Sequence, residues 1–363
     1  NINLINAISN TTFALLPALQ SLQLECNKIF DIEPQTFGQN GNLSYLNLRD
    51  NNLSTLRKGV LDNLVNLQVL DVSKNRLLRL TPDDIQKLNN LVHFSISENA
   101  KLCPQHCKDD LRFLLMLGNR LKVLKMSRLC LKNFPVTLTT SIRTLDLSAN
   151  NLTSVRTGDL ENFPFLEELD LSANELTVVE TDVFFRLEYL EVLHLQNNRL
   201  RRVPTQLPPS LRYLRLDGNR IAVIGRTDFY NLSKLSSLRL DSNSIKSIEN
   251  ESFYSLGNLA FLDISRNPIR ELNTDAFEGA NNVETFRASG LRYVRLNATD
   301  LRFFPVSELP NLRYLNLSGS SELAVAFLMD YPLLTTVKQL EILDMDDGNL
   351  KRMPSHLESL LPR

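Results

Sequence analysis

One pattern, Leu-x-x-Leu-x-Leu-x-x-Asn-x-Leu, recurs along the whole sequence and constrains the fold more than any other feature. Residues 43–53 form one copy and residues 166–176 another. The position of the asparagine, called the asparagine slot below, occurs fifteen times and holds Asn eleven times. A fixed period of this kind indicates a solenoid in which each coil stacks only on its neighbours. The slots are Asn3, Asn27, Asn51, Asn75, Asn99, Leu129, Asn150, Asn174, Asn198, Asn219, Asn243, Asn267, Leu291, Ser320 and Gly348.

The centre of the repeat predicts a short β-strand. The two leucines of Leu-x-Leu are separated by one residue, so they point to the same side of a strand, toward the core, and the residue between them points outward. Successive slots are mostly 24 residues apart, with extremes of 21 and 30. This length returns each strand to lie parallel to the previous one. We therefore expect a concave sheet of about 14 to 15 short parallel strands.

The asparagine and the residues that follow it predict the rest of the coil. An asparagine amide can satisfy backbone groups that a turn leaves unpaired, so stacked asparagines are expected to form a ladder. Leu129 and Leu291 interrupt this ladder and mark irregular coils. Apolar residues follow the slot at offsets of two, five and ten, as Ile29, Ile32 and Phe37 show. They are expected to fill the outer side of each coil.

These residues resemble the extracellular leucine-rich-repeat superfamily over essentially the whole chain. The 24-residue repeats with a phenylalanine are similar to those of Toll-like receptor ectodomains. The shorter repeats with proline, at 133–135 and 203–208, are similar to those of small leucine-rich proteoglycans. Three long spacings, of 30, 29 and 28 residues, favour the receptor. The resemblance implies an α/β leucine-rich-repeat solenoid, a curved horseshoe with a concave parallel β-sheet and a mostly irregular or 3-10 convex side.

No sequence boundary divides the 363 residues, because no linker of biased composition interrupts the apolar pattern. We expect a single leucine-rich-repeat domain over 1–363, with an irregular insertion at 100–120 and irregular repeats at 285–345. The cysteine-rich caps usual in this superfamily are missing from both ends. Either atypical caps cover the core edges or the intact protein continues. The longest apolar run, around 324–329, is far below the ~20 residues of a membrane-spanning helix, so membrane attachment would require a segment absent from this chain.

The charge balance narrows the class of partner. Lys and Arg number 40 and Asp and Glu number 41, a net charge of −1. No overall field favours nucleic acid or an anionic membrane, so we expect no nucleic-acid partner. We expect instead a protein or microbial ligand, or another leucine-rich-repeat chain in a homo- or heterodimer, selected by the local surface.

Three of the four cysteines surround the longest repeat. A disulfide from Cys103 or Cys107 to Cys130 would pin the insertion and would fit an extracellular protein, with free thiols as the alternative. Zinc bound by these residues and His106 is disfavoured, because adjacent His and Cys make an awkward tetrahedral set. We expect no metal and no cofactor. Cys26 lies beside the asparagine of its repeat and is expected to be a free or intermolecular thiol.

Eight Asn-x-Ser/Thr sequons favour secretion. Some of them arise simply because the repeat pattern contains Asn-Leu-Ser, so their number alone overstates this evidence. Those outside the expected strands are the better glycosylation candidates, whereas Asn316 points into the concave sheet, where a glycan would block a ligand. The sequons are at Asn10, Asn42, Asn52, Asn151, Asn231, Asn250, Asn297 and Asn316.

The outward strand residues predict where a partner binds. Arginine and aromatic side chains supply much of the energy at protein interfaces, and both kinds recur on the expected concave face. The alternative is that these side chains only keep an exposed sheet soluble. The sequence Leu-Asp-Leu-Ser is common in repeats of this kind, so charged residues at these positions do not by themselves indicate a ligand. The candidate ligand-binding residues are Tyr45, Arg212, Tyr213, Arg215, Arg239, Phe261, Arg287 and Tyr314.

No arrangement of residues points to catalysis. The four histidines are scattered, and no Ser/His/Asp set or phosphate-cradling glycine loop is recognisable. We therefore expect no enzyme and no catalytic residue. The function favoured is macromolecular recognition by an extracellular receptor ectodomain of the innate-immune, signalling or adhesion type. The alternative is a secreted matrix or circulating immune protein that sequesters its partner. A cytosolic repeat protein is a third class, which glycans on native material would exclude.

Overall fold

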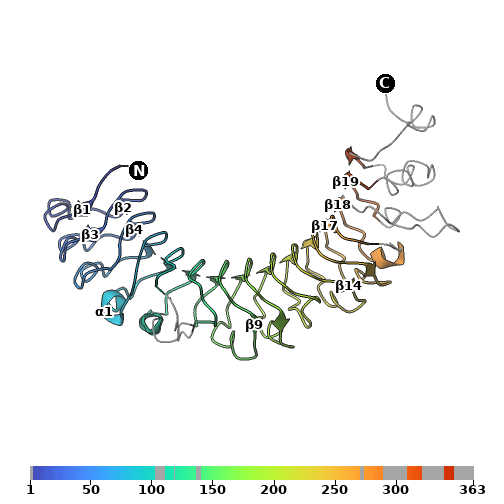
Figure 1. The fold of residues 1–363 in the computed structure, drawn as a ribbon, viewed down its shortest axis with the longest axis horizontal. Coiled ribbons are helices and arrows are strands. Elements are labelled where there is room, and N and C mark those ends of the chain that lie inside the picture. The colour runs from blue at the N-terminus through green and yellow to red at the C-terminus, as the bar shows by residue number, and fades with distance from the viewer. Residues whose placement is uncertain are drawn as a thin grey trace, which may run out of the picture. The chain divides into compact units, whose positions relative to one another are not determined.

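The computed structural model describes residues 3–102, 111–117, 119–135, 140–269, 274–288, 309–320 and 339–346. The chain forms two compact units, Asn1–Glu175 (unit 1) and Leu176–Arg363 (unit 2). In each unit the described chain winds in successive coils, and each coil adds one strand to a parallel β-sheet (Figure 1).

Seven three-residue strands form the sheet of unit 1. Neighbouring strands pair in register, so that Leu46 lies beside Leu70 and Leu124 beside Leu145. These middle residues are buried, and the first and third residues of each strand face outward. The strands are β2 (Ser21–Gln23), β4 (Tyr45–Asn47), β5 (Val69–Asp71), β6 (His93–Ser95), β7 (Val123–Lys125), β8 (Thr144–Asp146) and β10 (Glu168–Asp170).

Unit 2 repeats the arrangement with seven more strands. Leu214, Leu238 and Leu262 are paired side by side and buried. The total of fourteen strands in the described residues confirms the predicted solenoid of about 14 to 15 short strands. The strands are β12 (Val192–His194), β13 (Tyr213–Arg215), β15 (Ser237–Arg239), β17 (Phe261–Asp263), β18 (Thr285–Arg287), β19 (Tyr314–Asn316) and β20 (Ile342–Asp344).

The asparagine ladder is confirmed by its hydrogen bonds. Asn243 donates its amide Nδ2 to the carbonyls of Leu216, one coil earlier, and Leu240, in its own coil, at 2.9 and 3.0 Å. Its Oδ1 accepts the backbone N–H of Ile221 at 3.0 Å. The slots from Asn51 to Asn99 in unit 1 repeat these contacts. In these coils one asparagine side chain thus bonds to three buried backbone groups of the turns.

Wherever the structure describes it, the residue immediately before a slot adopts a left-handed backbone conformation, with φ near +55° at positions such as Asp50 and Ser242. This conformation costs energy for residues other than glycine, so the ladder bonds help to hold the turn. At Gly218 a Cβ would lie 2.4 Å from the Oδ1 of Asn197, so a larger residue there would have to displace that side chain. The turn of each coil is therefore a fixed, strained unit with its own polar support.

The outer side of the coils is mostly irregular, as predicted. Its core is apolar: Ile29, Ile32 and Phe37 are buried, as their offsets from the slot predicted. The region predicted as an insertion holds a 3-10 helix at Arg112–Met116, and 103–110 lie outside the described residues. The short elements on this side are β1 (Ala7–Ile8), which pairs with β3 (Asp31–Ile32), β9 (Ser154–Val155), α1 (Pro82–Ile85), η1 (Arg112–Met116), β11 (Val178–Val179), β14 (Val223–Ile224), which pairs with β16 (Ser247–Ile248), and η2 (Thr274–Phe277).

A second amide ladder, which the sequence analysis did not predict, lies nine residues before the slot. Asn66 donates to the carbonyl of Gly41 at 2.9 Å, and Asn258 donates to that of Ser233 at 2.7 Å. These amides are exposed, so water competes for the same carbonyls. Among the described residues, no helix is long and apolar enough to cross a membrane.

Candidate binding surface

The first and third residues of every main strand form two columns on the solvent side of the sheet, here called the open face. In unit 2 the register places Tyr213, Ser237, Phe261, Thr285 and Tyr314 in the first column. The third residues of the same strands form the second column: Arg215, Arg239, Asp263, Arg287 and Asn316. The predicted sharing of one face by these arginines and aromatic residues is confirmed.

The aspartates of the open face are turn caps. Asp146 accepts the backbone N–H of Ser148 at 2.9 Å, and Asp263 accepts that of Ser265 at 3.0 Å. Asp71 and Asp170 accept the equivalent N–H groups of Ser73 and Ser172. A short side chain that binds the backbone two residues ahead stabilises the turn. The recurring Leu-Asp-Leu-Ser sequence is therefore explained by local structure and does not require a ligand.

Two of the candidate arginines are already paired within unit 2. Arg215 donates from Nε and Nη2 to the two carboxylate oxygens of Asp217, at 3.0 and 2.9 Å. Asp217 is buried, so this two-point contact neutralises a carboxylate that water cannot reach easily. Arg212 forms a looser and more exposed pair with Glu191, at 3.4 Å. Because their charges are already paired, these two arginines are weaker candidates for contacting a partner than their position on the open face suggests.

Two other arginines stack on aromatic rings. The guanidinium carbons of Arg239 and Arg287 lie 5.3 and 5.4 Å from the centroid of the Phe261 ring. Arg287 also lies 5.5 Å from the centroid of Tyr314. All three distances fall within the range of cation–π attraction. The four residues come from strands β15, β17, β18 and β19, and we call them the arginine–aromatic stack.

A line of carboxylates runs beside this stack at the turn end of the strands. Burial raises the pKa of Asp241, and the neighbouring Asp263 and Asp217 carboxylates raise it further. Hydrogen bonding from Ser242 and the nearby Arg239 lower the pKa of Asp241, but these effects are smaller. The surroundings of Asp241 thus disfavour its charged form.

Replacing Asp241 with asparagine is expected to stabilise the protein at pH 7. The folded-state pKa of Asp241 lies above its unfolded value, so the contribution of this group to stability is present below the unfolded pKa and is lost as the pH rises through the folded pKa. Urea midpoints measured at pH 7 and pH 3.5 test this. The midpoint should rise for Asp241→Asn at pH 7 and differ little from the unsubstituted protein at pH 3.5. An equal or lower midpoint at pH 7 would contradict the assignment.

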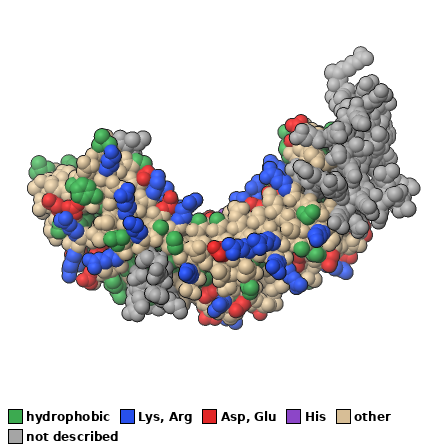
Figure 2. All heavy atoms as spheres, in the orientation of Figure 1, with side chains coloured by type: hydrophobic (Ala, Val, Ile, Leu, Met, Phe, Trp, Pro, Cys, Tyr) green, Lys and Arg blue, Asp and Glu red, His purple; other side chains and the backbone are tan. Residues whose placement is uncertain are grey.

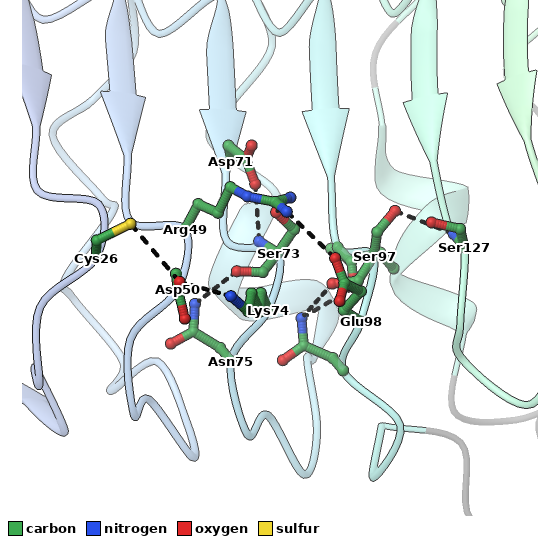
Figure 3. A network of polar contacts seen from close by, with 12 residues as sticks. Cys26, Arg49, Asp50, Asp71, Ser73, Lys74, Asn75, Ser97, Glu98 and Ser127 are labelled. Carbon is green, nitrogen blue, oxygen red and sulfur yellow. Dashed lines mark hydrogen bonds and ion pairs between the residues drawn. The ribbon is translucent and has the colours of Figure 1, made fainter.

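The open face of unit 1 carries a polar hollow of about 470 Å³. Tyr45 and His93 line it from the first column, and Asp71 and Lys125 line it from the second. Figure 3 shows the network at its turn end, where Arg49 reaches across to Glu98, its ion-pair partner at 3.2 Å. Position 49 lies two residues before an asparagine slot, and the equivalent residues of later coils, Ser73, Ser97 and Ser127, follow in the same row.

Charged groups in this network have shifted pKa values. The hydrogen bond from Lys74 lowers the pKa of Asp50, with a smaller lowering by the Cys26 thiol, whose Sγ lies 3.6 Å away. The same contact with Asp50 raises the pKa of Lys74. Burial, reinforced by Lys125, lowers the pKa of His93, although Asp71 opposes the shift. The hollow therefore holds a neutral imidazole at pH 7 beside charges of both signs.

The candidate residues divide between the two units. Tyr45 belongs to unit 1, and the other seven belong to unit 2. Sequence reasoning missed Arg49 and Glu98, which flank the asparagine slot outside the Leu-x-Leu centre. The repeat gave no signal for them, because the equivalent positions of neighbouring coils hold other residue types, such as Ser73 for Arg49 and Lys74 for Glu98. On the face drawn in Figure 2, both basic and acidic side chains are present.

The cysteine and sequon predictions are only partly covered by the structure. Cys26 and Cys130 are free and exposed, whereas Cys103 and Cys107 lie outside the described residues. The bridge from Cys103 or Cys107 to Cys130 stays a prediction, because neither of these two partners lies in the described part of the chain. Asn10 and Asn231 are exposed. Asn316 donates its amide to the Asp344 carboxylate at 2.8 Å, so this sequon is engaged on the open face. Asn297 lies outside the described residues.

The family described as leucine rich repeat matches residues 1–53, 17–77, 41–100, 140–202, 209–269 and 233–290, which together make up more than half of the chain. A curated mouse relative, leucine-rich repeats and immunoglobulin-like domains protein 2, is 45% identical over 62 residues. That match covers 17% of this chain and only 6% of the relative.

Solved structures show the same fold. The Toll–Spatzle complex of Drosophila superposes with a TM-score of 0.72 at 21% identity, covering 88% of this chain and 42% of that one. The functional domain of InlJ from Listeria monocytogenes gives 0.60 at 22% identity, covering 84% and 64%. The TLR13–ssRNA13 complex gives 0.51 at 21% identity, covering 95% and 58%. The chain thus spans about half of the length of the receptor chains that it matches.

Proposed function

The chain belongs to the leucine-rich repeat family, and from this we propose that it is the recognition domain of an extracellular receptor of the Toll-like type. Its partner is a protein or a microbial molecule. A protein partner can be a second leucine-rich-repeat chain, in a homo- or heterodimer. The domain binds this partner on the open face of unit 2. Proteins of this fold serve as recognition scaffolds whose surface side chains set the ligand.

The arginine–aromatic stack is the observation that carries this proposal. A structural role explains the aspartates of the face, which cap turns, and Arg215, which neutralises Asp217. No such role accounts for Arg239 and Arg287, because each has a stacking contact but no ion pair in the described residues. Arginine and aromatic residues dominate binding energy at protein interfaces. Exposed sequons such as Asn10 and Asn231 support an extracellular location.

Replacing Tyr213 with alanine is expected to weaken partner binding about tenfold or more, a loss typical of an exposed aromatic residue at an interface centre. The side chain of Tyr213 is 49% exposed on the open face. Tyr254 is 59% exposed on the outer side of unit 2 and supplies a matched control. Tyr254→Ala removes the same aromatic surface and should leave binding unchanged.

The partner for this comparison would come from a screen. Extracellular proteins displayed singly on yeast are tested with the tetramerised chain, and each binder is measured again with the two variants. Binders that lose affinity for Tyr213→Ala but not for Tyr254→Ala would support the open face of unit 2. Binders that ignore Tyr213 and depend on Tyr254 would place recognition on the outer side and refute the assignment.

A further inference from the structure

We propose that Arg239 and Arg287 form a paired carboxylate-binding site, and that the partner inserts an acidic segment whose two carboxylates lie on either side of Phe261. This inference rests on the proposed recognition function and adds the chemistry of the partner. Both guanidinium groups lie against the Phe261 ring, at 5.3 and 5.4 Å from its centroid.

The two arginines are held in place but lack an anion. The guanidinium groups lie over the rings of Phe261 and Tyr314. An arginine held against a ring can still donate its in-plane N–H groups to an acceptor. For Arg287 there is further evidence, because its Nε is buried and has no hydrogen-bond partner in the described part of the chain. A buried donor without an acceptor is costly in a folded protein. A carboxylate from a partner would satisfy it.

The neighbouring carboxylates do not serve as partners for these arginines. Asp263 lies between Arg239 and Arg287 in the register, yet it accepts the N–H of Ser265 and forms no ion pair with either arginine. Asp241 follows Arg239 by two residues, as Asp217 follows Arg215, but only Arg215 forms the two-point pair. Two cations therefore stay available beside Phe261.

The surroundings favour separate carboxylates over a continuous polyanion. Asp217, Asp241 and Asp263 border the arginines, and the other two carboxylates raise the pKa of Asp241. They would repel a phosphate or sulfate chain laid along the face. The faces of the Phe261 ring are already taken by guanidinium groups, so a nucleic-acid base has no free ring there to stack on. A protein segment can place single carboxylates and avoid the acidic border.

The spacing of the sheet fits such a segment. Arg239 and Arg287 are two strands apart, roughly 10 Å at the usual spacing between strands. Alternate side chains of an extended peptide point to one side about 7 Å apart. Flexible glutamate side chains can span the remaining distance.

A labelled peptide of five Glu-Ala repeats is the probe for this site, with fluorescence anisotropy at low salt as the measurement. Arg239→Gln and Arg287→Gln are each expected to weaken its binding about tenfold, the effect of losing a charge-assisted contact. Arg287→Lys should recover little of this loss, because lysine keeps the charge but not the planar fork. Arg220→Gln removes the same charge from an exposed site outside the sheet and is the matched control. Thermal unfolding of every variant checks that the fold is kept.

Four outcomes overturn the proposal: wild-type protein that does not bind the peptide, equal loss with Arg220→Gln, full recovery with Arg287→Lys, or tighter binding of an oligothymidylate or heparin fragment of equal charge. The last result would identify a polyanion site. The Tyr213 and Tyr254 comparison separates this from the proposed function. If displayed partners still require Tyr213 while the acidic peptide fails, recognition stands and only the acidic partner is wrong.

Discussion

Asn243→Ala should lower the free energy of unfolding by about 2–6 kcal/mol. It leaves one buried N–H without its acceptor, at a cost of ~1–3 kcal/mol. It also removes one of the two amide hydrogen bonds that each of two buried carbonyls accepts, at ~0.5–1.5 kcal/mol each, while Asn219 and Asn267 supply the remaining bonds. The carbonyls belong to Leu216 and Leu240, and the N–H belongs to Ile221. Asn243 is buried, so water cannot replace the amide without opening the turn. Urea denaturation followed by circular dichroism measures the loss.

Asn258→Ala is the matched control for the ladder. Its amide also donates to a carbonyl of the previous coil, that of Ser233 at 2.7 Å, but it does so at the surface. Water can take its place, and the cost should stay below about 1 kcal/mol. If the two alanine variants lose the same stability, burial of the slot asparagine is not what makes the ladder important.

Phe253→Ala should cost about 3–5 kcal/mol, the usual range for removing a buried phenylalanine. The Phe253 ring is fully buried and stacks on Phe229 with 5.9 Å between ring centroids. It also contacts Phe277 at 5.3 Å. Alanine would leave a cavity inside a row of rings contributed by three successive coils, and the rigid strands limit its collapse.

Tyr254→Ala, one residue further along the chain, tests whether the loss arises from burial. This ring is mostly exposed, so its removal should change stability by less than about 1 kcal/mol. Phe253→Leu should fall between the two, because leucine fills part of the space. A small effect of Phe253→Ala would mean that the outer side of the coils contributes little to the core.

The sequence by itself determined the repeat architecture. A period near 24 residues fixes which leucines of each coil face inward, and the asparagine slot fixes the turn. This holds because equivalent residues of successive coils pack against one another in the same way. Position within the repeat predicted the strands, the ladder and the burial of Phe253. It also predicted that the arginines and aromatic residues share one face. The second amide ladder recurs nine residues before the slot and could have been noticed from its spacing, although it lies outside the defining motif. The Arg49–Glu98 contact joins variable positions of two coils, so the repeat pattern does not predict it.

Only the tertiary structure decided which charges on the open face are paired. Arg215 and Arg239 occupy the same place in Leu-Arg-Leu-Asp, so local sequence predicts the same contacts for both. Arg215 lies beside the strand that begins with the small Ser237 and pairs with its own Asp217. Arg239 lies beside the strand that begins with Phe261 and stacks on that ring. The side chain of the next coil, 22 residues away in the sequence, made the difference.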